Sequence, residues 1–307
     1  MVAFTLIGAL SATVLSNYGP LSKSTPKTEI VKIGVPMEAG NVSPATEATP
    51  KVKILSFDPF IAHISDFISP SEREHLMNLG YPTPIASDSP VLISPRRQPL
   101  LKESIIRGED GLPTKSEGRT SSTAYLPETD PVVLALTQRA AEFQGYLSPE
   151  DIDIQITSYN PGQQYKHHFD WYPPPRARNR ISTFFAILKS TCDNCGTEFP
   201  FINITERATF DKRWCDALDC SKELLTTKNI EGSAIFWVNL DEKGQGRMDT
   251  LHAGLPALNG DKVGLNIWTD MDTKEVRRRG MFGTHSQHWY NPTQEFLEKH
   301  GMKRNED

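Results

Sequence analysis

The feature that most limits the possible folds is a group of strand-like segments between residues 151 and 268. The first, 151–159, alternates strictly, with Ile152, Ile154 and Ile156 on one face. The segments 181–188, 233–240 and 263–268 are rich in apolar, β-branched and aromatic residues. Several such segments separated by turn residues are typical of a β-sandwich or a barrel. We therefore predict that the second half of the chain forms a β-sandwich or barrel.

Two amphipathic helices are predicted upstream of these strands. Ser69-Pro-Ser-Glu72 has the pattern of a capping box with proline in the first turn, and Gly80 is the expected stop. A second helix starts at Asp130-Pro131 and ends near Gly145. We expect an α+β fold in which residues 51–149 are a helical support region and residues 150–273 form the core.

The ends of the chain read differently from the core. Residues 1–15 are apolar but too few to span a bilayer, which is typical of a secretory leader. Residues up to 50 are rich in Pro, Ser, Thr, Lys and Glu and are expected to be a disordered linker. A polar extension is expected for 274–307. We expect a secretory protein, in the endoplasmic reticulum or secreted, with a cytoplasmic protein as the alternative. Membrane contact is expected only if the leader remains as an uncleaved anchor.

The charge of the chain argues against a nucleic-acid partner. The net charge is −5 and there is no long basic block, whereas nucleic-acid-binding domains carry basic patches.

The four cysteines are clustered in an expected insert of residues 191–227. An even, clustered set suits two disulfides, and the sequons at Asn41 and Asn203 agree with an oxidising compartment. The spacing of the first two also suits zinc, and free thiols are a third interpretation. The residues are Cys192, Cys195, Cys215 and Cys220.

A candidate metal site is formed by two histidines and one carboxylate. His168 and Asp170 are two residues apart in an extended segment, so their side chains point to the same side. His252 supplies a second imidazole. This set, with open coordination positions, is the ligand set of non-haem Fe(II) oxygenases. Each histidine alone would be interpreted as a hydrogen-bonded structural residue, but the combination predicts an iron site.

Lys262 follows His252 after a turn at 258–261. We expect a hairpin at this turn, which would bring Lys262 near the metal. A lysine inside an apolar barrel is costly unless its charge is paired. The distal carboxylate of 2-oxoglutarate would be that partner. A solvated lysine at the edge of a turn is the alternative.

Several segments around these residues form an ordered set: Tyr159-x-x-Gly-Gln-x-Tyr-x-x-His-x-Asp170, Cys195-Gly-Thr-Glu-Phe-Pro200, Gly232-Ser-Ala-Ile-Phe-Trp237, His252-Ala-Gly-x-Pro256 and Gly260-x-Lys262. In this order they resemble the prolyl 4-hydroxylase family of 2-oxoglutarate- and Fe(II)-dependent dioxygenases. The resemblance covers residues 54–270 and is closest to fungal members with a cysteine-bearing insert. The chain departs from collagen-type enzymes at Cys195-Gly-Thr-Glu198, where they commonly have Gly-Gly-Glu-Thr, and their tandem-helical peptide-binding domain is not evident in the residues upstream.

The resemblance implies a double-stranded β-helix, or jelly-roll, barrel and a role for each matching residue. O2 would be a second cosubstrate, and ascorbate is expected as a further cofactor. For Tyr159, Thr183 and Trp268 core packing is the alternative. The implied roles are Fe(II) ligands (His168, Asp170, His252), 2-oxoglutarate binding (Lys262, Tyr165, Thr183) and lining of the substrate pocket (Tyr159, Trp268).

The reaction implied by the resemblance is hydroxylation of a peptidyl or free proline, with release of succinate and CO2. One alternative keeps the chemistry but acts on a small-molecule metabolite. Another is a catalytically silent barrel that serves as a binding domain. The expected partner is accordingly a peptide or a small molecule.

Overall fold

The computed structural model describes residues 50–80, 101–107, 113–145, 147–173, 176–204 and 211–279, which belong to the compact unit Thr46–Asp307. The expected leader and linker lie outside the described residues, apart from Pro50, and so does the C-terminal extension beyond residue 279. Within the described ranges, no helix has both the length and the apolar character needed to cross a membrane.

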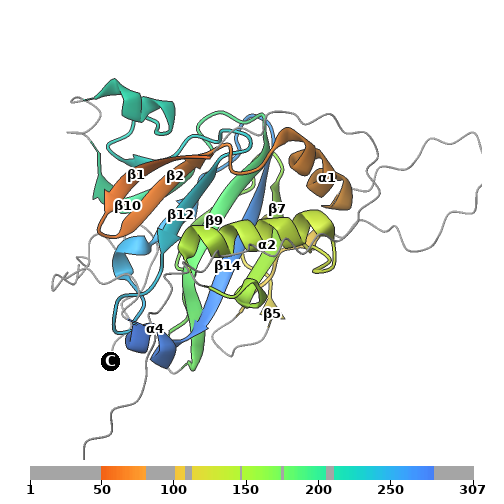
Figure 1. Cartoon of the computed structure of the whole chain (residues 1–307). Helices are drawn as coiled ribbons and strands as arrows, with labels where there is room; N and C mark the ends of the chain where they lie inside the picture. The colour runs from red at the N-terminus through yellow and green to blue at the C-terminus, as the bar shows by residue number, and fades with distance from the viewer. Residues whose placement is uncertain are drawn as a thin grey trace, which may run out of the picture. The chain divides into compact units, whose positions relative to one another are not determined.

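The core consists of a large and a small antiparallel sheet (Figure 1). The large sheet contains, in spatial order, β1 (Lys51–Phe57), β2 (Phe60–Ser65), β12 (Ala234–Val238), β9 (Arg178–Ser190), β14 (Lys262–Asp272), β7 (Ile152–Tyr159), β6 (Ser122–Tyr125) and β3 (Lys102–Glu103). The small sheet contains β11 (Leu224–Thr226), β10 (Thr197–Asn203), β13 (His252–Gly254) and β8 (Tyr165–His168). A separate pair is formed by β4 (Ile106–Arg107) and β5 (Pro113–Thr114).

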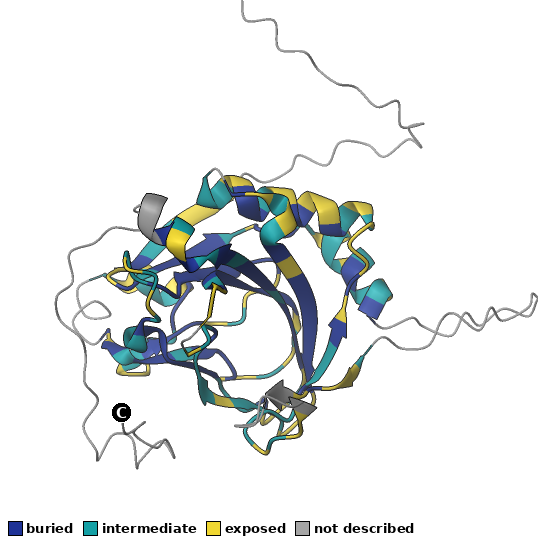
Figure 2. Ribbon diagram, turned by 90° about the horizontal axis from the view of Figure 1, so that it is seen from below, coloured by how far each residue is buried: buried dark blue, intermediate teal, exposed yellow. Residues whose placement is uncertain are grey.

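Helices α1 (Pro70–Gly80) and α2 (Pro131–Gln144) cover the outer face of the large sheet (Figures 1 and 2). A third helix, α4 (Thr273–Arg279), follows β14 directly. Short 3-10 turns are η1 (Pro149–Asp151), η2 (Lys212–Asp216) and η3 (Met248–Thr250).

Both predicted helix starts are confirmed by their capping contacts. The Ser69 amide donates to the Glu72 carboxylate at 2.8 Å, and the Glu72 amide donates to the Ser69 hydroxyl at 3.3 Å. At α2, the Asp130 carboxylate accepts from the two amides that follow Pro131. Arg139 of α2 also donates to Glu72 at 2.8 Å, so the cap of α1 is held by the second helix.

Alternation along the central strands separates a helix-side core from an interior face. Phe184 of β9 and Ile267 of β14 pack with the helices, whereas Phe185 and Trp268 point to the interior, because successive side chains lie on opposite faces of a strand. Gly264 lies on the interior face of β14. A Cβ there would meet the Phe185 ring at 2.2 Å, so only glycine lets this ring lie across the strand. The functional pocket lies on this interior face.

The expected fold class, an α+β double-stranded β-helix with supporting helices, is confirmed, although the two sheets do not form a closed barrel within the described residues. The four strand-like segments are β7, β9, β12 and β14, and β9 and β14 lie at the centre of the large sheet.

The region 51–149 supplies strands as well as helices. β2 pairs with β12, and β6 pairs with β7 at the other side of the sheet. β1 lies outside β2, and its register shifts between Ile54 and Ser56. At the other end, Val276 of α4 is buried in one cluster with Met271 and Leu240, so α4 packs on the core through this residue. The large sheet therefore takes strands from both sides of the boundary expected near residue 150.

The expected hairpin between His252 and Lys262 is wrong. β13 pairs with β10 and β8 in the small sheet, whereas β14 pairs with β7 and β9 in the large one. The turn at 258–261 therefore carries the chain from one sheet to the other. Lys262 still approaches the interior, because it lies on the inward face of β14.

Candidate metal centre and cosubstrate pocket

Three side chains from the small sheet form a compact group of potential metal ligands. His168 ends β8 and His252 begins β13, and the two residues are directly paired across the strands. Asp170 lies just beyond β8. One ligand atom from each of the three residues lies within 4.8 Å of the others. Among the described residues, this is the one group of three or more His, Cys, Asp or Glu side chains that could hold a metal ion.

Both imidazoles are oriented by backbone carbonyls. The Nδ1 atom of His168 is 2.8 Å from the carbonyl of Lys166, and Nδ1 of His252 is 2.9 Å from the carbonyl of Thr250. A carbonyl only accepts, so Nδ1 carries the proton in each ring. The Nε2 lone pairs therefore face Asp170, which is the arrangement seen for metal-binding histidines.

The ionisation states of the three residues suit a metal site. Burial lowers the pKa of His252, and burial together with His252 lowers the pKa of His168 well below the usual value. Burial would raise the pKa of Asp170, but the two histidines and Arg180 outweigh it and the pKa is lowered. The Nε2 distances to Asp170, 3.7 and 3.9 Å, thus join neutral rings to a carboxylate. Neutral imidazoles and an ionised carboxylate are the forms that bind metal.

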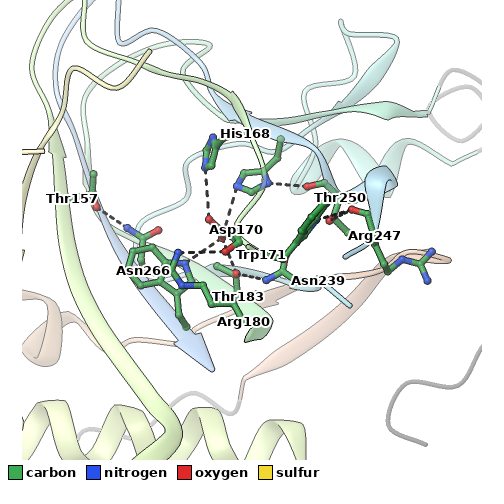
Figure 3. A network of polar contacts seen from close by, with 12 residues as sticks. Thr157, His168, Asp170, Trp171, Arg180, Thr183, Asn239, Arg247, Thr250 and Asn266 are labelled. Carbon is green, nitrogen blue, oxygen red and sulfur yellow. Dashed lines mark hydrogen bonds and ion pairs between the residues drawn. The ribbon is translucent and has the colours of Figure 1, made fainter. Parts of the chain in front are cut away.

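Side chains of the large sheet donate hydrogen bonds to the Asp170 carboxylate (Figure 3). Oδ2 accepts from the hydroxyl of Thr183 at 2.7 Å and from the indole N–H of Trp268 at 3.2 Å. Thr183 in turn accepts from the amide of Asn239 at 2.9 Å. The Arg180 guanidinium stacks on Trp268, 3.9 Å from the ring centroid. One oxygen of Asp170 is therefore fixed by the protein, and the other remains available to a ligand.

This donor set fits Fe(II). Two neutral imidazoles and one carboxylate on one side of a pocket form the facial triad of non-haem iron oxygenases. His168, Asp170 and His252 would hold the ion, and Thr183 and Trp268 would orient the carboxylate.

Lys262 places a buried positive charge on the interior face of the large sheet. Its side chain is 0% exposed. The ammonium donates to the Cys195 carbonyl at 2.6 Å and lies 4.7 Å from the Tyr159 ring centroid. Burial lowers its pKa to about 7, and no described carboxylate contributes to that value. A buried cation without a counter-ion is costly, so the site favours an anionic ligand.

The pocket beside the metal group is lined by aromatic rings, and two of its lining residues, Tyr159 and Gly254, are neighbours of the Lys262 ammonium. The Tyr165 ring stacks on His168 with 3.4 Å between centroids, and the Arg119 guanidinium lies 4.8 Å from the Tyr165 centroid. Tyr159 lines the wall beside Gly254. Burial raises the pKa of both tyrosines, so their hydroxyls stay protonated and can donate hydrogen bonds.

All the residues singled out from the sequence around this site are brought together by the fold. Lys262, Tyr165 and Tyr159 are close to the interior as expected, and their roles remain predictions. Thr183 was expected to contact the cosubstrate and Trp268 to line the substrate pocket. In the structure both side chains donate a hydrogen bond to Asp170. Sequence reasoning missed Asn239 and Arg180. Asn239 could have been recognised from the sequence, because it is a polar residue at the end of an otherwise apolar strand.

The four cysteines form two local disulfides, Cys192–Cys195 and Cys215–Cys220. In the structure, therefore, neither the zinc nor the free-thiol interpretation applies.

Comparison with known families gives a match over the central part of the chain. Residues 154–270 match the profile of the 2OG-Fe(II) oxygenase superfamily. Over these residues the chain is similar to 2-oxoglutarate- and Fe(II)-dependent oxygenases. This match and the triad support Fe(II) as the cofactor and 2-oxoglutarate as the cosubstrate.

The chain is similar to prolyl 4-hydroxylases within this superfamily. It is 29% identical to human prolyl 4-hydroxylase subunit alpha-3 over 237 residues, which are 74% of this chain and 36% of the human protein. It is 24% identical to prolyl 4-hydroxylase 2 of Arabidopsis thaliana over 75% of this chain and 74% of the plant protein. The prolyl 4-hydroxylase-like resemblance is confirmed, whereas the resemblance to fungal members stays a prediction. The chain thus spans 36% of the length of its human relative.

Solved structures include similar chains. The viral collagen prolyl hydroxylase of Paramecium bursaria Chlorella virus-1, in a complex with 2OG, aligns with a TM-score of 0.44 at 21% identity over 68% of this chain and 95% of the viral one. A Pseudomonas putida prolyl-4-hydroxylase aligns with a TM-score of 0.42 at 14% identity over 69% of this chain and 92% of the bacterial one.

Removing either hydrogen bond to the Asp170 carboxylate should weaken metal binding without preventing folding. Thr183→Val and Trp268→Phe each delete one donor to Oδ2, and loss of such a partner typically costs about 10- to 100-fold in metal affinity. Anaerobic Fe(II) titration would measure the change. Trp171→Phe is the matched control, because this indole donates to the Arg247 carbonyl instead. Equal Fe(II) affinity in all three variants would contradict the orienting role.

Proposed function

We propose that this protein is a dioxygenase that hydroxylates a prolyl residue of a peptide, or free proline, and converts 2-oxoglutarate and O2 to succinate and CO2. The observation that carries the proposal is the pairing of the His168, Asp170 and His252 group with a fully buried, uncompensated Lys262 in one interior. A metal site alone would suit many enzymes. The additional cation is what a dicarboxylate cosubstrate requires.

Each residue would have a defined task. Fe(II) and 2-oxoglutarate, when bound, supply the oxidation of a C–H bond by O2. His168, Asp170 and His252 would hold the metal on one face and leave the opposite positions open. Lys262 would bind the distal carboxylate, with Tyr165 as a second donor. Thr183 is also a proposed cosubstrate contact, although its hydroxyl hydrogen is committed to Asp170 in this structure.

The substrate side of the pocket is proposed to include Tyr159 and Trp268, with Arg119 at its edge. The names of the relatives, which are prolyl 4-hydroxylases, favour proline as the group that is hydroxylated. Hydroxylation of a small-molecule metabolite would use the same residues and is the second candidate. A silent binding domain would not need the buried lysine.

The direct test is anaerobic addition of Fe(II) and then 2-oxoglutarate, followed by visible absorption spectroscopy. A weak charge-transfer band that requires both reagents is expected, because an oxoacid chelates the open positions of a facial-triad iron. Succinate release would then be screened with proline-rich peptides, free proline and small metabolites. Bound metal without the band would refute 2-oxoglutarate as the cosubstrate, and no bound metal would favour a binding domain.

The affinity for 2-oxoglutarate should fall as the pH rises above about 7, the pKa to which burial lowers Lys262. Only the ammonium form attracts the carboxylate, so the apparent Kd should be nearly constant below this pKa and rise by up to about tenfold per pH unit above it. Anaerobic titrations between about pH 6 and 9 would measure it. Lys262→Arg is the control, because arginine stays charged throughout this range. The same pH slope in that variant would exclude Lys262 as the cause.

The setting of the enzyme is also a proposal. Two disulfides favour an oxidising compartment, so we propose the secretory pathway. Ascorbate is proposed as a reductant that keeps the iron in its ferrous state. We further propose a catalytic core of residues 150–273 with the cysteine-bearing insert 191–227, supported by residues 51–149.

A further inference from the structure

The hydrogen-bond acceptor of Lys262 belongs to a disulfide. The ammonium donates to the carbonyl of Cys195 at 2.6 Å, and Cys195 is bonded to Cys192 in a short turn. We propose that the Cys192–Cys195 disulfide positions Lys262 for 2-oxoglutarate by fixing the Cys195 carbonyl. The proposal rests on the proposed function, since it assigns a task within the same pocket.

Residues outside the turn hold Cys195 in place. It is 1% exposed. The side-chain amide of Asn229 donates to its carbonyl at 2.9 Å and lies 2.9 Å from its sulfur. The next residue is Gly196, where a Cβ would lie 1.7 Å from the Thr227 carbonyl oxygen, so the backbone is pressed against the neighbouring chain. These contacts fix one end of the turn to the core.

The disulfide fixes the other end. Cys192 is only half-buried, and between the two cysteines Asn194 has a φ of 55°, a left-handed conformation that is uncommon for residues other than glycine. The Ser190 hydroxyl lies 3.6 and 3.9 Å from the two sulfurs. Without the covalent bond the sulfurs must separate to van der Waals contact, and the turn is free to relax. The Cys195 carbonyl would then lose one of its two constraints.

The carbonyl and the cosubstrate can bind the ammonium together. A lysine ammonium has three donor hydrogens, so Lys262 can keep its bond to Cys195 while it donates to a carboxylate. Because Lys262 is 0% exposed, bulk solvent does not compete with the carbonyl for the ammonium. A displaced carbonyl would therefore leave the ammonium poorly oriented, and 2-oxoglutarate would have to order it on binding.

The second disulfide offers an internal control. Cys215–Cys220 lies in the same insert, and the Lys228 ammonium donates to the Cys215 carbonyl at 2.5 Å. Among the described residues, no contact joins this disulfide to Lys262.

The test compares Cys192→Ser/Cys195→Ser with Cys215→Ser/Cys220→Ser in the Fe(II)-loaded protein. Anaerobic titration with 2-oxoglutarate gives Kd, and succinate release gives KM and kcat. The first variant should raise Kd and KM for 2-oxoglutarate by about tenfold, the usual effect of losing a hydrogen bond to a charged group. Fe(II) affinity and kcat at saturating 2-oxoglutarate should remain. The second variant should behave like the wild type.

Chemical reduction gives the same comparison without a substitution in the turn. Dithiothreitol closes to its cyclic disulfide as Cys192 and Cys195 each gain a hydrogen, and it is then removed by desalting. Reduction should raise Kd in the Cys215→Ser/Cys220→Ser variant and have no effect in the Cys192→Ser/Cys195→Ser variant. Equal responses in both variants, or a Kd that falls, would overturn the proposal.

A third variant covers the case in which the double variant does not fold. Asn229→Ala keeps both disulfides and removes only the amide that holds the Cys195 carbonyl, so it should raise Kd in the same direction. An unchanged Kd would count against the proposal. Failure of the proposed function is distinct, because the oxidised wild type would then bind no 2-oxoglutarate at all.

Discussion

Replacement of Lys262 by methionine is expected to weaken 2-oxoglutarate binding at least about a hundredfold, because breaking a buried ion pair costs several kcal/mol. In the absence of the cosubstrate the same change should stabilise the protein. Methionine has a similar length and no charge, so it fills the space beside Tyr159 without a desolvation penalty. Binding and stability should thus move in opposite directions.

The stabilisation should depend on pH in a defined way. The ordinary lysine pKa is 10.5, and burial lowers the pKa of Lys262 to about 7. Between these values the unfolded chain binds more protons than the folded one, so wild-type stability rises with pH. Below this window the penalty is on the order of 5 kcal/mol, and above it the penalty disappears. The advantage of the methionine variant should therefore be largest near pH 7 and small near pH 10.5.

Denaturant unfolding of the cosubstrate-free protein at the two pH values would measure this difference. Lys189→Met is the matched control, since Lys189 is exposed on β9 beside Val263 of β14. It should change neither stability nor 2-oxoglutarate affinity appreciably. A methionine variant of Lys262 that binds 2-oxoglutarate normally would remove this residue from the cosubstrate site.

Asp170→Asn is expected to reduce Fe(II) affinity by more than about a hundredfold. Loss of a hydrogen-bond partner of a metal ligand costs up to about a hundredfold, and loss of the charged ligand itself should cost more. Succinate release should fall to background. The fold should persist, since the amide oxygen can still accept from Thr183 and Trp268 in place of the carboxylate. The variant thus separates the charge of Asp170 from its hydrogen bonds.

Equilibrium dialysis with Fe(II) and a succinate assay would measure both effects. Asp153→Asn, an exposed position on β7, removes the same charge outside the pocket and serves as the control. Retained oxygenase activity in Asp170→Asn would refute Asp170 as a metal ligand.

Local sequence patterns predicted the parts of this fold that depend on neighbouring residues. The Ser69 and Asp130 caps, the strand alternation of β7 and the shared side of His168 and Asp170 follow from the periods of helix and strand. Those periods do not say which strands pair. That β2 lies against β12, or that β13 and β14 belong to different sheets, is decided by packing between distant segments.

The supporting contacts of the site were out of reach for the same reason. Thr183 and Trp268 were noticed for other roles, and their convergence on Asp170 needs the two sheets to be opposed. The contact between Lys262 and the Cys195 carbonyl is equally remote in sequence. Every residue has a backbone carbonyl, so no sequence motif could have predicted which carbonyl Lys262 contacts.

The outer strand of the large sheet carries a consequence for solubility. β1 has one neighbouring strand among the described residues, and a strand in this position can present amide and carbonyl groups to an extended chain. It begins with Lys51-Val-Lys53, and its register shifts between Ile54 and Ser56. Lysines and an irregular register are devices by which sheet edges discourage pairing with another molecule. The outer side of the large sheet at β1 is thereby a poor template for aggregation.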